Sequence, residues 1–408
     1  MAREEFFVHT LPNGIRCVLK RVRSEVCYCS MTIGAGSRDE QKEERGVAHL
    51  LEHTLFKGTT RRKAWQVNCR LENRGGEINA FTTKEETVVH ATVMKGDFGK
   101  AVELIDDIIF HSTFPDVEVE KEKEVIVDEI NMYKDSPEER IYDEFEDRLF
   151  AGSELGHNIL GSKRELAKLD SAKIRSFVER NYTTDRMVFA AIGNISPKRF
   201  VAEMERSFGA ERATTRSEQR AVPEVVKPFN ITKSHPSHHQ VRCIMGARAY
   251  SLNDKRRLAL ILMTNLLGGP SAASRLNVAL RERNALTYCV EALYTPLSDS
   301  GMLTIYFSCE RDKVEQCRKV IGEELQRLVE EPLGKRQLAI AKRQFMGQFA
   351  ISAENSEAYM LGVGKSFLVF GGVDGSEEVN RKVDALAPED IQQVAREILP
   401  TLSTLTYI

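Results

Sequence analysis

Two histidines and a glutamate lie about one helical turn apart in the segment His49–His53, which reads His-Leu-Leu-Glu-His. At about 100° per residue, His53 lies roughly 40° from His49 around a helix and Glu52 roughly 60° away on the other side, so all three share one face. Neutral imidazoles at i and i+4 can chelate a zinc ion, and a carboxylate beside them can take a proton from water. With nine histidines in 408 residues, only about 0.02 chance matches to H-x-x-E-H are expected. The segment therefore predicts a zinc site in preference to a surface helix with two unrelated histidines.

A catalytic zinc ion needs a third protein ligand and a position left open for water. The acidic helix predicted at Lys121–Tyr133 offers Glu122, Glu124, Asp128 and Glu129. Glu122 and Glu129 are seven residues apart, which places them within about 20° of each other on one helix face. Spacing alone does not choose between Asp128 and Glu129, and a solvated charged face is the alternative explanation for this run of acids.

The residues around these candidates predict the elements that must position them. A helix from about Gly46 to Phe56 carries leucines on the face opposite the histidines, which would anchor it in a core. Period-two alternation predicts a strand at Val26–Ile33, and Glu85–Val93 is also typical of a strand. The acidic helix begins near Val117 and ends before the segment Asp135–Pro137.

The second half of the chain repeats the pattern of the first. Leu169–Ile174 aligns with Leu386–Ile391 at a shift of 217 residues, and each segment opens an amphipathic helix that leads to a strand. A polar, proline-containing segment at 213–228 separates the halves and predicts an interdomain linker. We therefore expect an α+β fold with two related domains, 1–212 and 229–408, each a mostly antiparallel sheet with helices packed on it.

The residues flanking the histidines resemble a known signature. Gly46–Thr59 is similar to the zinc motif of the M16 (pitrilysin-type) metallopeptidases, in particular the short bacterial branch that resembles the mitochondrial processing peptidases. In that branch a ligand glutamate lies about 76 residues beyond the second histidine. The resemblance therefore implies Glu129 as the third zinc ligand, and it implies Glu122 as an upstream acid that supports the site.

Two further segments carry the same resemblance. Asn79-Ala80-Phe81 and the threonine after them match the edge strand with which this family pairs extended substrate backbone, a mode of binding that gives affinity without side-chain selectivity. In the second half, Ser274–Tyr288 is similar to a block whose arginine and tyrosine bind substrate near the metal, here Arg281 and Tyr288. The chain has Asn284-Ala285 where the family often has Arg-Gly, a departure that leaves the Arg281 and Tyr288 pair intact.

The resemblance implies a zinc-dependent endopeptidase that hydrolyses peptides or unfolded polypeptide segments within a chamber. His49, His53 and Glu129 would hold one Zn²⁺ per chain, and Glu52 would be the general base. A shift of the zinc residues by 217 gives Leu266, Gly269, Pro270 and Met346, so the second domain has no metal set of its own. The alternative is a catalytically silent subunit of the same fold or a peptide-binding chaperone.

Composition restricts the partners. Lys and Arg total 58 against 60 Asp and Glu, and aromatic residues make up 7% of the chain, which argues against nucleic acid as a partner. No apolar run is long enough for a membrane span. The acidic first residues lack a signal or transit pattern, so we expect a cytoplasmic protein. The family pattern of two facing halves predicts a homodimer, with a heterodimer of related chains as the alternative.

Overall fold

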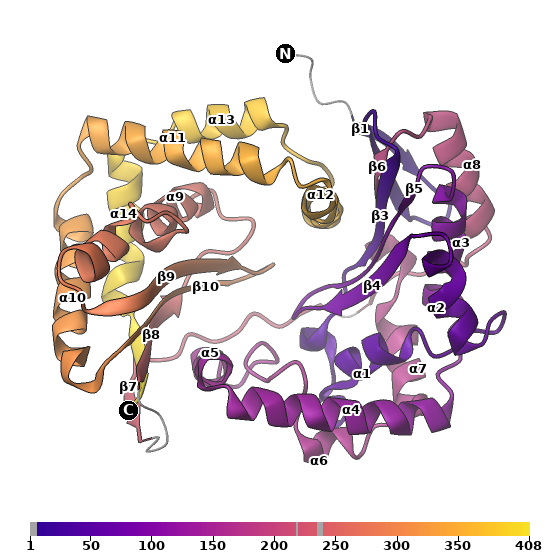
Figure 1. The fold of residues 1–408 in the computed structure, drawn as a ribbon, viewed down its shortest axis with the longest axis horizontal. Helices are drawn as coiled ribbons and strands as arrows, with labels where there is room; N and C mark the ends of the chain where they lie inside the picture. Colours follow the sequence, from indigo (N-terminus) through magenta and orange to yellow (C-terminus); the bar gives the residue numbers. More distant parts are fainter. Residues whose placement is uncertain (1–5, 218, 235–239) are drawn as a thin grey trace. The chain divides into compact units, whose positions relative to one another are not determined.

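The computed structural model describes residues 6–217, 219–234 and 240–408. The chain forms two compact units, each of which combines one sheet with several helices (Figure 1). Unit 1 comprises Met1–Met132, Asn158–Arg220 and Ile351–Gly375, and unit 2 comprises Tyr133–His157, Ala221–Ala350 and Ser376–Ile408. The boundary between Arg220 and Ala221 lies inside the segment 213–228. In addition, Tyr133–His157 from the first half of the chain belongs to unit 2, and Ile351–Gly375 from the second half belongs to unit 1.

The sheet of unit 1 has six strands in the order β1-β2-β6-β3-β5-β4. The β2–β6 pair is parallel and the other pairs are antiparallel. The strands are β1 (Phe6–Thr10), β2 (Arg16–Arg21), β3 (Val26–Ile33), β4 (Glu77–Thr82), β5 (Thr87–Met94) and β6 (Met187–Gly193).

The sheet of unit 2 has five strands in the order β7-β11-β8-β10-β9, and only the β7–β11 pair is parallel. This order matches β2-β6-β3-β5-β4 strand for strand, including the position of the parallel pair. The prediction of two related α+β domains is therefore confirmed, and β4 and β9 are equivalent edge strands. The strands are β7 (Asn230–Lys233), β8 (Val241–Arg248), β9 (Thr287–Pro296), β10 (Gly301–Cys309) and β11 (Ser403–Tyr407).

Helices α1, α4, α7 and α14 lie where the sequence analysis predicts helices. Unit 1 contains α1 (Val47–Thr54), α2 (Ala64–Glu72), α3 (Phe98–His111), α6 (Lys163–Leu166), α7 (Ser171–Asn181), α8 (Pro197–Phe208), α12 (Ser356–Phe370) and most of α4 (Asp116–Asp135). Unit 2 contains α5 (Pro137–Leu149), α9 (Arg257–Gly268), a π-helical turn (Asn277–Glu282), α10 (Val314–Glu330), most of α11 (Lys335–Ser352), α13 (Ser376–Asp384) and α14 (Pro388–Ile398). Short 3₁₀ turns occupy Ser37–Asp39, Lys42–Glu44, Thr184–Arg186, Arg311–Lys313 and Leu399–Thr401.

Each unit covers its sheet with one helix that comes from the other half of the sequence. Helix α5 packs on β8 and β11 of unit 2, and α12 packs on β3 and β6 of unit 1 (Figure 1). These are equivalent strands in the two sheets. The approach is close in both cases: a Cβ on Gly246 would lie 2.8 Å from the Phe145 ring, and a Cβ on Gly364 would lie 2.6 Å from Thr32 Oγ1. Glycine at both positions therefore permits the contact between helix and strand.

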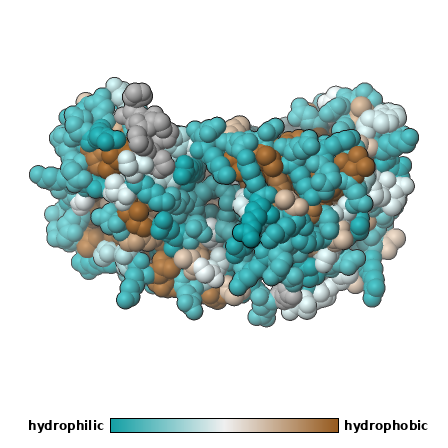
Figure 2. Space-filling model, turned by 90° about the horizontal axis from the view of Figure 1, so that it is seen from below, coloured by the Kyte–Doolittle hydropathy of each residue, from teal (hydrophilic) through white to brown (hydrophobic). Residues whose placement is uncertain are grey.

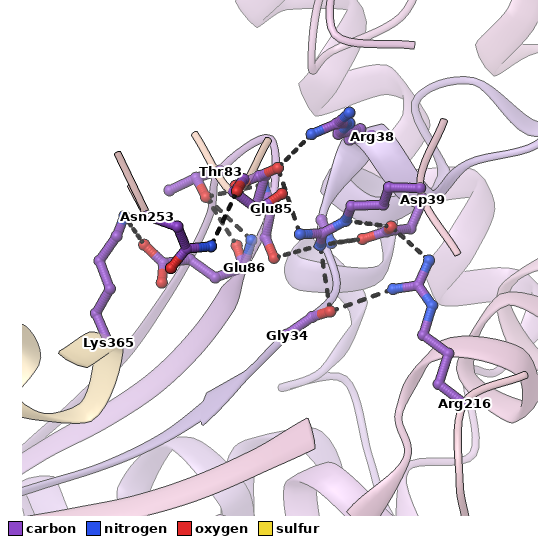
Figure 3. A network of polar contacts seen from close by, with 12 residues as sticks. Gly34, Arg38, Asp39, Thr83, Glu85, Glu86, Arg216, Asn253 and Lys365 are labelled. Atoms are coloured by element: carbon purple, nitrogen blue, oxygen red, sulfur yellow. Dashed lines mark hydrogen bonds and ion pairs between the residues drawn. The ribbon is translucent and has the colours of Figure 1, made fainter. Parts of the chain in front are cut away.

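A buried ionic network connects the segment that follows α8 to the rest of unit 1 (Figure 3). The side chain of Asp39 is fully buried and accepts hydrogen bonds from Arg216 at 2.6 Å and from Arg220 at 2.9 and 2.8 Å. Arg38 pairs with Glu85 at 2.5 Å beside it. Burial alone would raise the pKa of Asp39, but the two arginines outweigh burial and hold this pKa below its ordinary value.

Hydrophilic residues cover most of the face shown in Figure 2, where apolar side chains appear as separate patches. Within the described part of the chain, every helix is too short or too polar to cross a membrane.

Candidate metal centre

Helix α1 begins at a backbone turn that its sequence specifies. Gly46 has φ 89°, a left-handed conformation that favours glycine, and a Cβ there would lie 2.9 Å from the carbonyl oxygen of Leu160. The buried carboxylate of Glu40 accepts hydrogen bonds from the Gly46 and Ala48 N–H groups at 2.9 Å each. These bonds satisfy donors that a helix start leaves unpaired. Glu40 thereby fixes the end of the helix that carries both histidines, a role that sequence spacing did not indicate.

The apolar face of α1 lies in the core, as the leucine pattern predicts. Leu50, Leu51 and Leu55 are fully buried, which leaves the opposite face to the two histidines and the glutamate. Helix α4 runs beside α1, as Figure 1 shows, and Glu129 on α4 meets that face. Glu129 is half-buried there, whereas the alternative ligand Asp128 is exposed.

The donor atoms of His49, His53 and Glu129 form one compact cluster. Glu129 Oε2 lies 3.7 Å from His49 Nε2 and 3.6 Å from His53 Nε2, and the three donor atoms all lie within 4.8 Å of one another. Bonds of about 2.0–2.1 Å in a tetrahedral arrangement separate ligand atoms by roughly 3.3 Å. Two imidazoles and one carboxylate at these separations fit a zinc ion with one position left open.

Glu122 holds His53 in an orientation suited to a ligand. Its Oε2 lies 3.1 Å from His53 Nδ1, and its Oε1 pairs with Lys57 Nζ at 2.7 Å. An Nδ1 proton donated to this carboxylate leaves the Nε2 lone pair directed at the cluster. The predicted upstream acid thus touches one of the histidines, and Lys57 completes the chain of contacts.

Burial sets the protonation of the other histidine. It lowers the pKa of His49 to about 4, with a smaller contribution from the neighbouring His53. His49 is therefore neutral at pH 7, the form that binds metals. Its Nδ1 is buried and has no hydrogen-bond partner among the described residues.

Glu52 shares the face of the histidines but is not part of the donor cluster. Its half-buried side chain lies against Thr82 at the end of β4. Burial raises the pKa of Glu52 and the charge of Glu129 adds to this, while Thr82 and His53 act in the opposite direction. A carboxylate of this kind can accept a proton beside the cluster and release it again.

The predicted substrate strand is β4, one edge of the six-stranded sheet. Asn79 is exposed, Ala80 is buried and Phe81 is half-buried, in register with His90, Val89 and Val88 of β5. The amide oxygen of Asn79 accepts a hydrogen bond from the Ala80 N–H at 2.8 Å. An extended peptide could pair with this edge because β4 contributes only one of its two sides to the sheet.

The predicted Arg281 and Tyr288 both line one cavity of about 550 Å³ in unit 2. Arg281 is the penultimate residue of the π-helical turn, and Tyr288 lies near the start of edge strand β9 with 84% of its surface exposed. Between them Ala285 has φ 48°, a conformation that glycine adopts more readily. The structure thus groups these two residues with each other in unit 2, and it groups the histidines and glutamates in unit 1.

Two family models match successive parts of the chain, and the first part includes His49, His53 and Glu129. The model for the insulinase-type peptidases, peptidase family M16, matches residues 16–163, and the model for the M16 inactive domain matches residues 168–345. The chain is 33% identical to a protein of Bacillus subtilis named uncharacterized zinc protease YmxG, over 96% of this chain and 95% of that one. It is 32% identical to an uncharacterized zinc protease of Mycobacterium leprae, over 96% and 88% of the two chains.

Solved structures agree in fold. A protease from Helicobacter pylori superimposes with a TM-score of 0.90 over 99% of both chains, at 19% identity. A structure described as the peptidase M16 inactive domain from Pseudomonas fluorescens gives 0.88 over 98% of both chains, also at 19% identity. At this level of identity the two structures support the arrangement of strands and helices alone.

Proposed function

Because the chain belongs to peptidase family M16, in which its relatives are named zinc proteases, we propose that it is a zinc-dependent endopeptidase. The observation that carries the proposal is the cluster of His49, His53 and Glu129, with Glu52 beside it on the same helix face. A catalytically silent member of the fold has no need of a complete donor set with a spare carboxylate next to it. The proposed substrates are peptides or unfolded polypeptide segments.

Three side chains would hold the metal. The Nε2 atoms of His49 and His53 and the Oε2 atom of Glu129 would be its ligands, and Glu122 would keep the His53 ring in place through Nδ1. When bound, zinc supplies a Lewis acid that polarises a carbonyl group and makes water more acidic. The spare position in this set is what distinguishes a catalytic site from a structural one.

Glu52 would move the proton. One of its carboxylate oxygens would accept a proton from the attacking water, and the same oxygen would deliver it to the amide nitrogen of the leaving chain. Its half-buried position supports this assignment, because burial raises the pKa of the carboxyl group above its ordinary value and so makes it a stronger base.

Strand β4 would bind the substrate backbone. An edge strand can pair only with an extended chain, so folded proteins would be poor substrates and flexible peptides good ones. A peptide that pairs here would replace the bond between Asn79 and Ala80 with its own. Arg281 and Tyr288 would contribute further contacts to substrate, and the proposed functional unit is a homodimer.

Glu52→Gln and His53→Ala separate metal binding from chemistry. After dialysis against metal-free buffer, wild-type protein and Glu52→Gln are expected to hold about one zinc per chain, while peptide hydrolysis by Glu52→Gln falls by about 10²–10⁴-fold. His53→Ala is expected to lose both zinc and activity. Glu124→Gln, on the exposed face of α4, is the matched control and should change neither property. Near-normal hydrolysis by Glu52→Gln would contradict the general-base role, and full zinc content in His53→Ala would contradict the ligand assignment.

A further inference from the structure

A second group of potential ligands lies in unit 1, formed by Asp106, His111 and Glu211. Asp106 and His111 come from the last turns of α3, and Glu211 follows α8. His111 Nε2 lies 3.7 Å from Asp106 Oδ2 and 3.7 Å from Glu211 Oε1, and the three donor atoms lie within 4.8 Å of one another. These separations are almost those of the cluster on α1. None of the sequence patterns that indicated the first cluster includes these residues.

One carboxylate of this group is buried and has an oxygen that no hydrogen bond from a described residue uses. Asp106 is 3% exposed, and its Oδ1 atom has no hydrogen-bond partner among the residues that the structure describes. Burial raises the pKa of Asp106 to about 6 in spite of a bond from Arg61, and burial together with Asp106 raises the pKa of Glu211. A buried carboxylate with an unused oxygen is stabilised by a bound cation.

An arginine side chain occupies the place of that cation. Arg61 Nη1 lies 3.1 Å from Asp106 Oδ2 and Arg61 Nη2 lies 2.7 Å from His111 Nε2, so it contacts two of the three donor atoms. Its side chain is 48% exposed and can turn outward without crossing the core. Arg61 Nε also lies 3.9 Å from Oδ1 of the neighbouring Asp107, whose other carboxylate oxygen is held by Thr59 and Arg62 at 2.9 and 2.6 Å.

We propose that Asp106, His111 and Glu211 form a second zinc site, which Arg61 occupies when the metal is absent. One imidazole and two carboxylates are a donor set that zinc accepts, and the three ligands leave the remaining positions to water. The ion would tie the end of α3 to the chain that follows α8. This site binds more weakly than the cluster on α1, because a bound ion must first displace a guanidinium group.

Zinc titration of the full-length chain tests this proposal without any measurement of activity. The variant His53→Ala removes the first site, so calorimetric titration with Zn²⁺ alone should reveal one remaining equivalent per chain. His53→Ala combined with His111→Gln should reveal none, and circular dichroism verifies that the double variant is folded. If His53→Ala binds no zinc, the proposal is overturned. It is also overturned if the folded double variant still binds one zinc ion per chain.

Arg61 provides a sharper test of the same site. In the His53→Ala background, Arg61→Ala should strengthen zinc binding by about fivefold or more, because a charge-assisted contact no longer competes with the ion. Arg70→Ala is the matched control, since Arg70 pairs with Glu103 at 3.1 Å and touches none of the three ligands. Equal zinc affinities in the Arg61→Ala and Arg70→Ala variants would contradict the proposal that Arg61 and zinc compete for the site. These results do not depend on whether the cluster on α1 is catalytic.

Discussion

The two units share one topology but not one chemistry. In unit 1, α1 contacts edge strand β4 and helix α7; in unit 2, α9 contacts edge strand β9 and helix α14. The histidine face of α1 has no counterpart on α9, whose residues Leu260, Leu262 and Met263 are buried in the core. The two units therefore share a scaffold, and a few side chains on α1 and α4 distinguish the unit that carries this cluster of potential ligands.

The edge strands differ in the same way. Strand β4 ends beside Glu52, whereas β9 carries the exposed Tyr288 as its second residue and borders the cavity that Arg281 also lines. Both strands offer an unpaired backbone edge, and β4 lies within the unit that carries His49, His53 and Glu129. We infer that the units divide the work of the proposed reaction, with chemistry on unit 1 and additional substrate contacts on unit 2.

The strongest test of this comparison concerns how each unit is held together. Asp39→Asn removes the charge that two buried arginines share in unit 1, and breaking such a network is expected to cost about 3–5 kcal/mol in free energy of unfolding. Asp254→Asn in unit 2 is the matched control, because its partner Arg256 is 44% exposed and the pair should contribute less than about 1 kcal/mol. Chemical denaturation measures the free energy of unfolding of both variants. Equal losses would show that the buried network of Asp39 stabilises the protein no more than the exposed Asp254–Arg256 pair does.

Some of this architecture could be predicted from the sequence. The spacing of His49, Glu52 and His53 on a helix with three leucines on its other face specified α1, and the acidic helix was found within two residues of its ends. The choice between Asp128 and Glu129 could not be made from spacing, because one residue turns a helix by about 100° and the rotation of α4 against α1 depends on packing.

Other features depend on contacts between distant residues. The amphipathic pattern of α5 and α12 shows which face of each helix is apolar, but not which sheet that face covers. The bonds of Glu40 to Gly46 and Ala48 come from a loop without any periodic signal. Asp106 and Glu211 are about a hundred residues apart, so their proximity depends on how α3 and α8 pack.

Removal of Arg281 tests the proposed division of work. Arg281→Ala is expected to lower kcat/KM for a peptide by about 10²-fold while the zinc content stays unchanged, because a cationic contact to substrate is lost and no metal ligand is touched. Arg283→Ala, two residues along and outside the cavity lining, is the control. Loss of zinc from Arg281→Ala would contradict the separation between the two units.

A mixture of two impaired variants then identifies which chain Arg281 serves. In mixed dimers of Glu52→Gln and Arg281→Ala, one site can combine an intact Glu52 with an intact Arg281 from different chains. Recovery of activity in the co-refolded mixture is expected if the functional unit is a homodimer with composite sites. Proven subunit exchange without recovery would place Arg281 in its own chain's site or outside the chemistry.

Helix α5, which the first half of the chain contributes to unit 2, predicts a pH dependence of stability. Glu144 on α5 contacts Lys233, Tyr407 and Arg148 at 2.6, 2.8 and 2.9 Å. Burial alone would raise the pKa of Glu144, but these three partners outweigh it and hold the pKa below the ordinary value of 4.5. Its contribution to stability is therefore present above pH 4.5 and is lost as the pH falls through the lowered pKa of the folded state.

Glu144→Gln should consequently lower the free energy of unfolding at pH 7 by about 1–2 kcal/mol. The difference from wild type should shrink toward zero as the pH falls below the folded-state pKa, where the wild-type carboxyl group is itself protonated. Glu139→Gln, exposed on the same helix, is the control. A difference that is independent of pH would mean that Glu144 stabilises α5 through packing rather than charge.

The smallest expected effect concerns the turn between Arg281 and Tyr288, where the chain has Ala285 and the family often has glycine. At φ 48° the alanine Cβ is crowded by its own backbone, and relief of this strain contributes about 1–2 kcal/mol. The greater freedom of glycine in the unfolded chain offsets about 0.5–1 kcal/mol of that gain. Ala285→Gly should therefore stabilise unit 2 by roughly 0.5–1 kcal/mol, as measured by denaturation. Leu286, which comes next, is buried, and the Ala285 N–H already donates to Arg281 O at 3.1 Å, so the backbone path need not change.

Zinc content and kcat/KM should stay constant in Ala285→Gly if the turn merely spaces the two side chains. A fall in kcat/KM with unchanged zinc would instead show that the strained alanine positions Arg281 and Tyr288 for substrate.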